Sequence, residues 1–434
     1  MIELADIALR LALLMAVWGT ALSFSGQALA RTDFISSGTR GFHAATGFTA
    51  LAAAGLWWGF VSGDFSVPLI AAHSNERLPT ALRVSALWAG HAGLLLLWSL
   101  FFSCCSSVAL LSQARTRTGR RPAPDAKPGV MLGVVLSASL TLSTVVDNPF
   151  SRLGVAMADG RGLEPALQHW ASAIEAPMML LGWSAAIVAS VLIVGGWRAG
   201  MGRELRVRRA GWWSVVAFAF LAASAELHAW WSYAHGGLAP LLPAVSAAGW
   251  TPLFSLVALT LLLLAGGRPR RSAWVLLVAG AALLAAGLVG TRFIRAYDVV
   301  LSDGESFSAT DAWRTTWKFT SQGTSRIERP NYALVAVALL PSRAGVRQPF
   351  VTAELRHFDD ESEREPSTPE SNPALRIMAA QDLAVTLREV GDGRARLHLS
   401  FLPLASCIWL GGAALIVAGL AALAPRGPVR EEWR

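Results

Sequence analysis

Charged residues are scarce in this sequence. They make up 15% of the 434 residues, whereas 53% of the residues are hydrophobic, and a soluble globular protein carries roughly 25% charged residues. A membrane-spanning helix needs about 20 mostly apolar residues, so the chain has room for several spans and a modest water-soluble part. The composition therefore predicts an integral membrane protein.

Cysteine pairs and the common catalytic signatures are also missing. The three cysteines are Cys104, Cys105 and Cys407, all within apolar runs, and none belongs to a C-x-x-C or C-x-x-C-H motif. This excludes a redox or zinc pair and covalent haem attachment to the chain itself. The sequence contains no Ser/His/Asp arrangement, P-loop or dinucleotide-binding signature, so it gives no support to a hydrolase, an ATPase or a nicotinamide enzyme, and no catalytic residue is assigned.

The net charge of +8 does not indicate nucleic-acid binding. The arginines lie in short loops between apolar runs, where positive charge determines membrane topology. The chain has no basic patch of the kind that contacts phosphates and no nucleic-acid-binding motif. We therefore expect that the chain binds no nucleic acid and that the lipid bilayer surrounds most of it.

Long apolar runs predict about nine membrane spans. The first run follows Glu3 and Asp6 and lacks a basic leader, so we interpret it as a retained span and not a signal peptide. The shortest run is 250–266. The runs lie near 5–28, 41–62, 88–112, 128–147, 173–197, 211–229, 250–266, 272–291 and 403–423.

The arginine-rich loops orient these spans. Arginines cluster in loops 113–127, 198–210 and 267–271, and these loops fall on one side once the spans alternate. Because cytoplasmic loops are enriched in Lys and Arg, we predict that these loops are cytoplasmic, with the N-terminus outside and the C-terminus inside. Loops 63–87, 148–172 and 230–249 should then face outward.

A long polar stretch precedes the last apolar run. Within 296–402, several segments alternate polar and apolar residues or are rich in β-branched residues. We predict a mainly α fold, a polytopic transmembrane helical bundle with a small β-rich extracytoplasmic domain. The expected division is 1–295 for the helical domain, 296–402 for the β-rich domain, and 403–434 for the final helix and cytoplasmic tail.

Three motifs lie around the second and third apolar runs. Asp64 to Val67 is similar to a "DFSV" span end, Ser74 to Pro79 to an "SN-x-x-LP" segment, and Trp88 to Trp98 to a "W-G-x-H-E-G-S-LLLW" helix entry. These motifs resemble the CcmF family of cytochrome c maturation proteins, which is related to the CcsA haem-handling membrane proteins. Asp147 to Leu153 and Trp409 to Gly412 resemble two further family segments. The motifs occur in the family order along nearly the whole chain, in a shortened form.

The resemblance implies cytochrome c maturation in a bacterial inner membrane. Members of this family take haem b on the outer face and help attach it to the cysteines of apocytochrome c, together with other maturation proteins of the membrane. They use a Trp-rich outer segment and histidine axial ligands, and imidazole suits haem iron. The resemblance thus implies a possible haem lyase component.

This chain departs from the family at the haem ligands. Carboxylates, Glu175 and Asp303, stand at the two outer histidine positions, and Thr260 or Leu261 replaces a histidine of the seventh span. Most of the Trp-rich segment reads Leu238 to Gly249 here. Either other histidines bind the iron, or haem is not bound at that site.

Replacement ligands are available near the outer face. His169 lies six residues before Glu175, and the seven-residue separation of His228 and His235 places them on one helical face if the sixth span extends that far. We predict His228 and His235 as iron ligands. The full set of predicted haem-binding residues is His169, His228, Trp230, Trp231, Tyr233, His235 and Trp250.

Other interpretations remain open. These residues could be interfacial aromatics and hydrogen-bonded histidines at a membrane boundary. The chain could also be a CcmF-like assembly or scaffold protein that no longer binds haem. Glu226 within a span would allow a transporter, although the sequence shows no inverted repeat.

Overall fold

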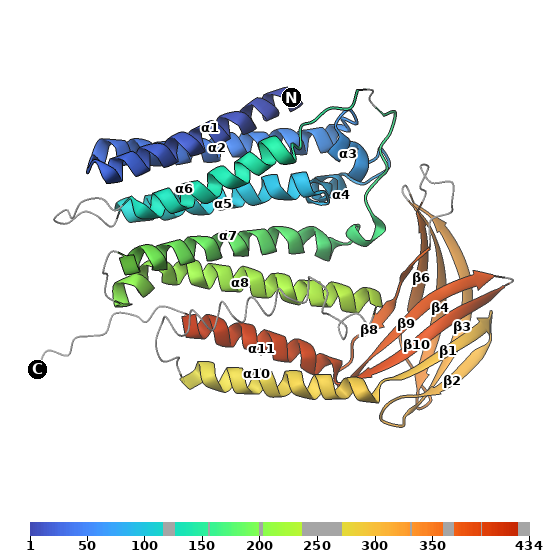
Figure 1. Ribbon diagram of the computed structural model, residues 1–434. Coiled ribbons are helices and arrows are strands. Elements are labelled where there is room, and N and C mark those ends of the chain that lie inside the picture. Colours follow the sequence, from blue (N-terminus) through green and yellow to red (C-terminus); the bar gives the residue numbers. More distant parts are fainter. Residues whose placement is uncertain are drawn as a thin grey trace, which may run out of the picture. The chain divides into compact units, whose positions relative to one another are not determined.

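The computed structural model shows a helical part and a β-rich part (Figure 1). The described residues form two compact units, 1–224 with 422–423 and 225–236 with 271–421. The predicted run 250–266, with Thr260 and Leu261, and Trp250 lie outside them. The described residues are 1–115, 126–154, 157–198, 203–236, 271–329, 332–358, 369–391 and 393–423.

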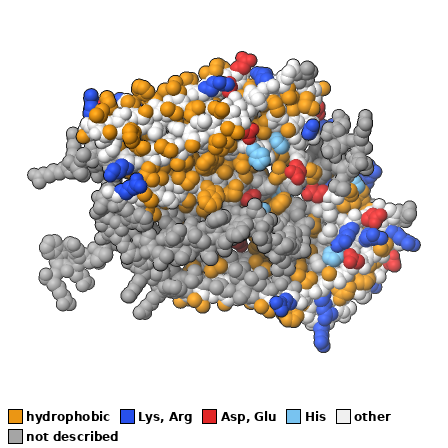
Figure 2. Space-filling view, viewed as in Figure 1, with side chains coloured by type: hydrophobic (Ala, Val, Ile, Leu, Met, Phe, Trp, Pro, Cys, Tyr) orange, Lys and Arg blue, Asp and Glu red, His pale blue; other side chains and the backbone are white. Residues whose placement is uncertain are grey.

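Long helices form the first unit. They are α1 (Ile2–Ala28), α2 (Thr32–Ser62), α5 (His91–Arg115), α6 (Lys127–Thr141), α7 (Trp170–Arg198) and α8 (Arg203–Gly236), the last of which continues into the second unit. Apolar side chains cover much of the helical flank (Figure 2), as expected where the surrounding solvent is lipid. Six of the described helices are long and apolar enough to cross a membrane.

Glycines bring α1 and α2 into close contact. A Cβ at Gly38 would lie 2.4 Å from Ser23 Oγ and 2.7 Å from the carbonyl oxygen of Gly19. Small residues at such positions let transmembrane helices approach closely, which strengthens van der Waals packing in the absence of a hydrophobic driving force. A larger side chain at Gly38 would separate the two helices.

Short elements form the loops of this unit. The loop after α2 contains α3 (Pro68–His73), α4 (Thr80–Ser85) and η1 (Ala86–Trp88), and α6 is followed by a π-helical turn η2 (Leu142–Val146) and later by η3 (Pro165–Leu167). The backbone N–H of Leu153 donates to the carbonyl of Ser66 at 2.8 Å, and that of Arg161 to Ala71 at 2.7 Å. Loops 63–87 and 148–172, both predicted to face outward, therefore lie at the same end of the helices.

The second unit joins helices to two antiparallel sheets. Its helices are the end of α8, α10 (Arg271–Gly290) and α11 (Ala405–Leu423), with η6 (Thr291–Phe293) after α10. The sheets have the strand orders β1-β10-β9-β8 and β2-β3-β4-β6-β7, with β5 paired to β4. The strands are β1 (Arg295–Ser302), β2 (Ser306–Thr310), β3 (Thr316–Glu328), β4 (Tyr332–Arg343), β5 (Val346–Arg347), β6 (Val351–Phe358), β7 (Glu370–Asn372), β8 (Ala374–Arg376), β9 (Gln381–Gly391) and β10 (Arg394–Pro403).

Alternating apolar residues from both sheets form one core. Trp317 and Phe319 of β3 and Phe401 of β10 are fully buried, and the Trp317 and Phe401 ring centroids lie 5.7 Å apart. In β3 and β10, buried residues alternate with exposed or half-buried ones, which is the pattern of two packed antiparallel sheets. The mainly α fold class with a β-rich domain is confirmed.

The exact number of nine spans and the three-part division of the chain stay predictions. Besides the six candidate spans, the described residues include α10, which has 20 residues, and a shorter apolar segment of α11, Ala405–Ala421. Both occupy predicted apolar runs, 272–291 and 403–423. The chain is a polytopic membrane protein.

Candidate functional site

The C-terminal end of α8 carries most of the predicted haem-binding residues. The helix continues to Gly236, beyond the predicted span 211–229, so positions 228 and 235 lie on one continuous helix. At about 100° per residue, Glu226, Trp230 and Tyr233 share one helix face, and positions 228, 231 and 235 share the opposite face. The predicted residues are therefore divided between two faces.

The first face packs against α11. The ring centroid of Trp409 lies 5.6 Å from that of Trp230 and 5.2 Å from that of Tyr233, both nearly edge-on. One turn further along α11, a Cβ at Gly412 would lie 2.5 Å from a carboxylate oxygen of Glu226. A larger residue at 412 would require the Glu226 side chain to move.

A buried hydrogen bond ties the same face to the β-rich part. The Tyr233 hydroxyl donates to Asp382 Oδ2 at 2.8 Å, and the backbone N–H of Met378 donates to the other oxygen at 3.0 Å. Tyr233 is 1% exposed and Asp382 is fully buried. Burial raises the pKa of Asp382, and the two hydrogen bonds oppose that rise. Tyr233 thus connects α8 to β9.

The second face carries the imidazole predicted to bind iron. The rings of His228 and Trp231 lie 5.8 Å apart and are tilted by 43°, and both residues are partly exposed. An imidazole beside an indole fits one axial haem ligand with an adjacent flat aromatic surface. Position 235 follows two turns after His228 in the same register.

His169 caps a helix. Its Nδ1 accepts the backbone N–H of Ala171 at 3.1 Å at the start of α7, and its ring lies 5.5 Å from that of Trp170. This is the geometry of an N-cap residue. His169 belongs to the first unit and His228 to the second.

The two carboxylates that the resemblance places at ligand positions occupy unrelated surroundings. Glu175 lies within α7, where its carbonyl oxygen accepts the Ser224 hydroxyl at 3.3 Å. Asp303 lies in the exposed turn between β1 and β2, with a carboxylate oxygen 3.1 Å from where a Cβ would stand on Gly323. The described residues contain no group of three or more His, Cys, Asp or Glu side chains that could hold a metal ion.

Sequence reasoning missed Asp382 and the packing role of Trp409. Tyr233 and Asp382 are 149 residues apart, and Asp382 stands in a polar stretch where an aspartate has no distinguishing local pattern. The sequence identifies Trp409 only as part of the segment 409–412 that resembles the family, and it does not indicate the contact with α8. The first five residues of β9 are all buried, so no alternating pattern marks Asp382 in the sequence.

The chain matches no family model, but it is similar to curated cytochrome c-type biogenesis proteins. It is 31% identical to CcmF of Pseudomonas aeruginosa over 239 residues, 53% of this chain and 35% of the relative. NrfE of Haemophilus influenzae is 30% identical over 191 residues, 43% and 28% of the two chains. Ccl1 of Rhodobacter capsulatus is 28% identical over 237 residues, 54% and 35%. The chain thus matches about a third of the length of these relatives.

One solved structure shares the fold. The structure described as "Cytochrome c Heme Lyase CcmF" matches with a TM-score of 0.68, covering 98% of both chains at 16% identity. At this identity the likeness concerns the fold. The arrangement of helices and sheets described above is therefore one that a known protein also adopts.

Proposed function

We propose, on the premise that this chain is a CcmF-type protein in sequence and in fold, that it takes part in cytochrome c maturation. The observation that carries the proposal is the similarity of about half of the chain to curated cytochrome c-type biogenesis proteins. In the proposed role, the chain holds haem b at the outer face of a bacterial inner membrane and presents it to apocytochrome c. Other membrane proteins of cytochrome c maturation are the proposed partners.

The second face of α8 is the proposed haem contact. His228 supplies an imidazole beside Trp231, and His235 is the proposed second ligand, with His169 and Trp250 as further candidates. We assign Trp230 and Tyr233 to holding α8 in place, because their rings contact Trp409. Haem, when bound, supplies the vinyl groups that react with cysteine thiols, and the chain contributes binding and orientation.

The proposed orientation places the N-terminus outside and the C-terminus in the cytoplasm. The arginine-rich loops support it through the positive-inside rule. At the opposite end, the hydrogen-bonded loops 63–87 and 148–172 carry few lysines and arginines. In this orientation the outer end of α8 and the β-rich domain face the compartment where apocytochrome c receives haem.

A spectrum of the purified protein tests haem binding. We expect a Soret band with a pyridine-haemochrome signature of haem b, and its loss in the double variant His228→Ala/His235→Ala, because axial imidazoles hold the iron. His357→Ala is the matched control, since His357 is exposed on β6, and it should keep the spectrum. An unchanged spectrum in the double variant would remove both histidines from the ligand list.

A deletion strain tests the function itself. We expect loss of haem-stained c-type cytochromes and restoration by the wild-type gene, since attachment of haem depends on positioning both reactants. Normal cytochrome c levels in the deletion strain would contradict the proposal.

A scaffold function is the second candidate, and a specific observation favours it. Glu175 and Asp303 replace family histidines, and two aromatic residues of the Trp-rich segment are used for packing against α11. A deletion strain that loses cytochrome c, combined with purified protein that contains no haem, would support this function over the first.

A further inference from the structure

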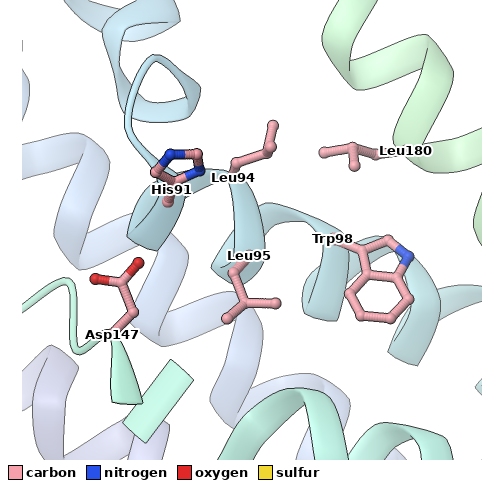
Figure 3. Close-up of a pocket in the computed structure, with 6 residues that line it drawn as sticks. All are labelled: His91, Leu94, Leu95, Trp98, Asp147 and Leu180. Atoms are coloured by element: carbon pink, nitrogen blue, oxygen red, sulfur yellow. The ribbon is translucent and has the colours of Figure 1, made fainter. Parts of the chain in front are cut away.

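A pocket lies on the first unit, and none of its lining residues belongs to the predicted haem-binding set. It has a volume of about 310 Å³ and is lined by His91, Leu94, Leu95, Trp98, Asp147 and Leu180 (Figure 3). Four of these residues follow one face of α5 at positions i, i+3, i+4 and i+7. The volume is at the lower end of the roughly 300–1,000 Å³ that ligand pockets occupy.

The pocket is polar at one end and apolar along its length. His91 begins α5 and Asp147 follows the π-helical turn η2, so both stand at the end of the helices that carries loops 63–87 and 148–172. Leu94, Leu95 and Trp98 continue inward along α5, and Leu180 of α7 points toward them (Figure 3). From His91 to Trp98 the helix rises about 10 Å.

His91 has His73 as an electrostatic neighbour, but the two polar side chains of the pocket lack hydrogen-bonding partners among the residues that the structure describes. Neither His91 nor the Asp147 carboxylate makes a hydrogen bond or ion pair with them. An imidazole can donate to an anionic oxygen, and a carboxylate can accept from an ammonium group. Together they would match a head group that carries a negatively charged oxygen and a positively charged ammonium.

The η2 turn places Asp147 at the pocket. The N–H of Asp147 donates to the carbonyl of Leu142 at 2.9 Å, which closes a π-type turn and ends the helix. Single π turns inside helices are frequent at functional sites. A regular α-helical continuation would rotate residue 147 away from its present position.

We propose that this pocket binds a phospholipid with a primary-amine head group, such as phosphatidylethanolamine. Its phosphate receives a hydrogen bond from His91, its ammonium donates to Asp147, and one acyl chain lies along Leu94, Leu95, Trp98 and Leu180. The occupant is a lipid because the pocket lies on membrane-spanning helices, and its polar end coincides with the ends of these helices, where head groups lie. A choline head group has no N–H to donate to Asp147.

The test compares retained lipids. The purified full-length chain is reconstituted in nanodiscs with equal amounts of dioleoyl phosphatidylethanolamine and dioleoyl phosphatidylcholine, and lipids retained after release are counted by native mass spectrometry. We expect one retained phosphatidylethanolamine at a preference of about tenfold, the size of one charge-assisted hydrogen bond. Asp147→Asn should remove the preference, and Asp33→Asn, an exposed carboxylate on α2, should leave it unchanged.

A second variant tests the apolar part. Leu180→Trp should fill the pocket and remove the retained lipid, whereas Leu51→Trp, at an exposed position on α2, should keep it. Thermal unfolding of each variant confirms that it is folded. Equal retention of both lipids by the wild type, an unchanged preference in Asp147→Asn, or an unchanged lipid count in Leu180→Trp would each overturn the proposal. Loss of haem from Leu180→Trp without loss of lipid would also overturn it and would identify the occupant as haem.

Discussion

At the scale of single residues, buried carboxylates determine how the β-rich part is held together. Asp311 is fully buried at the start of the turn between β2 and β3. Burial alone would raise the pKa of Asp311, but hydrogen bonds outweigh it and hold the pKa below its ordinary value. The donors are Trp317 Nε1 at 3.0 Å, Gln381 Nε2 at 2.6 Å, and the backbone N–H groups of Trp313 at 2.9 Å and Thr315 at 2.8 Å.

Removing this carboxylate should destabilise the protein strongly. Asp311→Ala leaves four donors unpaired, and we expect a loss of about 2–4 kcal/mol in the free energy of unfolding, with Asp311→Asn intermediate because its amide offers one accepting oxygen. Thermal unfolding of the purified chain in detergent measures the change. Asp298→Ala is the control, because Asp298 is exposed and pairs with His398 at the surface, and its unfolding temperature should stay near that of the wild type.

The pH dependence gives a second measurement on the same variants. A carboxyl whose folded-state pKa lies below its unfolded value of 3.8 stabilises the fold above that value, and this stability is lost as the pH falls through the folded pKa. The stability difference between wild type and Asp311→Asn should therefore shrink as the pH is lowered below 3.8. A difference that grows on acidification would show that Asp311 is protonated in the folded protein.

At the scale of secondary-structure elements, glycine positions decide how helices pair. A Cβ at Gly287 of α10 would lie 2.5 Å from Ile408 Cγ1 and 2.9 Å from its backbone nitrogen on α11. A Cβ at Gly280, two turns earlier, would lie 3.0 Å from the carbonyl of Gly411. The two helices that flank the β-rich part along the chain thus touch through their backbones, which small residues allow.

Replacing Gly287 by Leu should separate α10 from α11. The new side chain meets backbone atoms that cannot move aside, so we expect a loss of about 1–3 kcal/mol, the usual effect of overpacking, and faster proteolysis of the β-rich part. Gly47→Leu on α2 is the matched control, because nothing lies within 4 Å of its Cβ position. Equal unfolding temperatures and proteolysis rates for the two variants would contradict the packing role of Gly287.

Sequence periodicity predicted the helices better than their ends and contacts. Apolar length placed a span at 211–229, but Glu226, His228 and Tyr233 interrupt the apolar run, whereas α8 continues to Gly236. Packing on α11 and the Tyr233 hydrogen bond to Asp382 stabilise the added turns, and such long-range contacts have no local signal. Because the predicted span ended at 229, the sequence did not indicate that Trp230 and His228 lie on opposite faces of one helix.

At the scale of the whole molecule, charge and hydropathy predicted more than any single motif did. The apolar runs anticipated the six candidate spans as well as α10 and α11, because hydrocarbon requires helices of a minimum length. The alternating segments of 296–402 anticipated strands, although their pairing into two sheets depends on contacts far apart in sequence. The ligand positions were the least predictable, since the resemblance places carboxylates, Glu175 and Asp303, where it implies histidines.

The last prediction concerns the side of the membrane that carries the β-rich domain. The arginine-rich loops assign positions around Ser306 to the outside and the turn between α1 and α2 to the cytoplasm. The parent protein for this test has Cys104, Cys105 and Cys407 replaced by Ser. In it, Ser306→Cys, at an exposed position of β2, should react with a membrane-impermeant maleimide in intact spheroplasts. Thr32→Cys, exposed at the start of α2, should react only after the inner membrane is permeabilised. The reverse pattern would invert every loop assignment and place the C-terminal end of α8 in the cytoplasm, where the proposed haem contact could not meet a secreted apocytochrome.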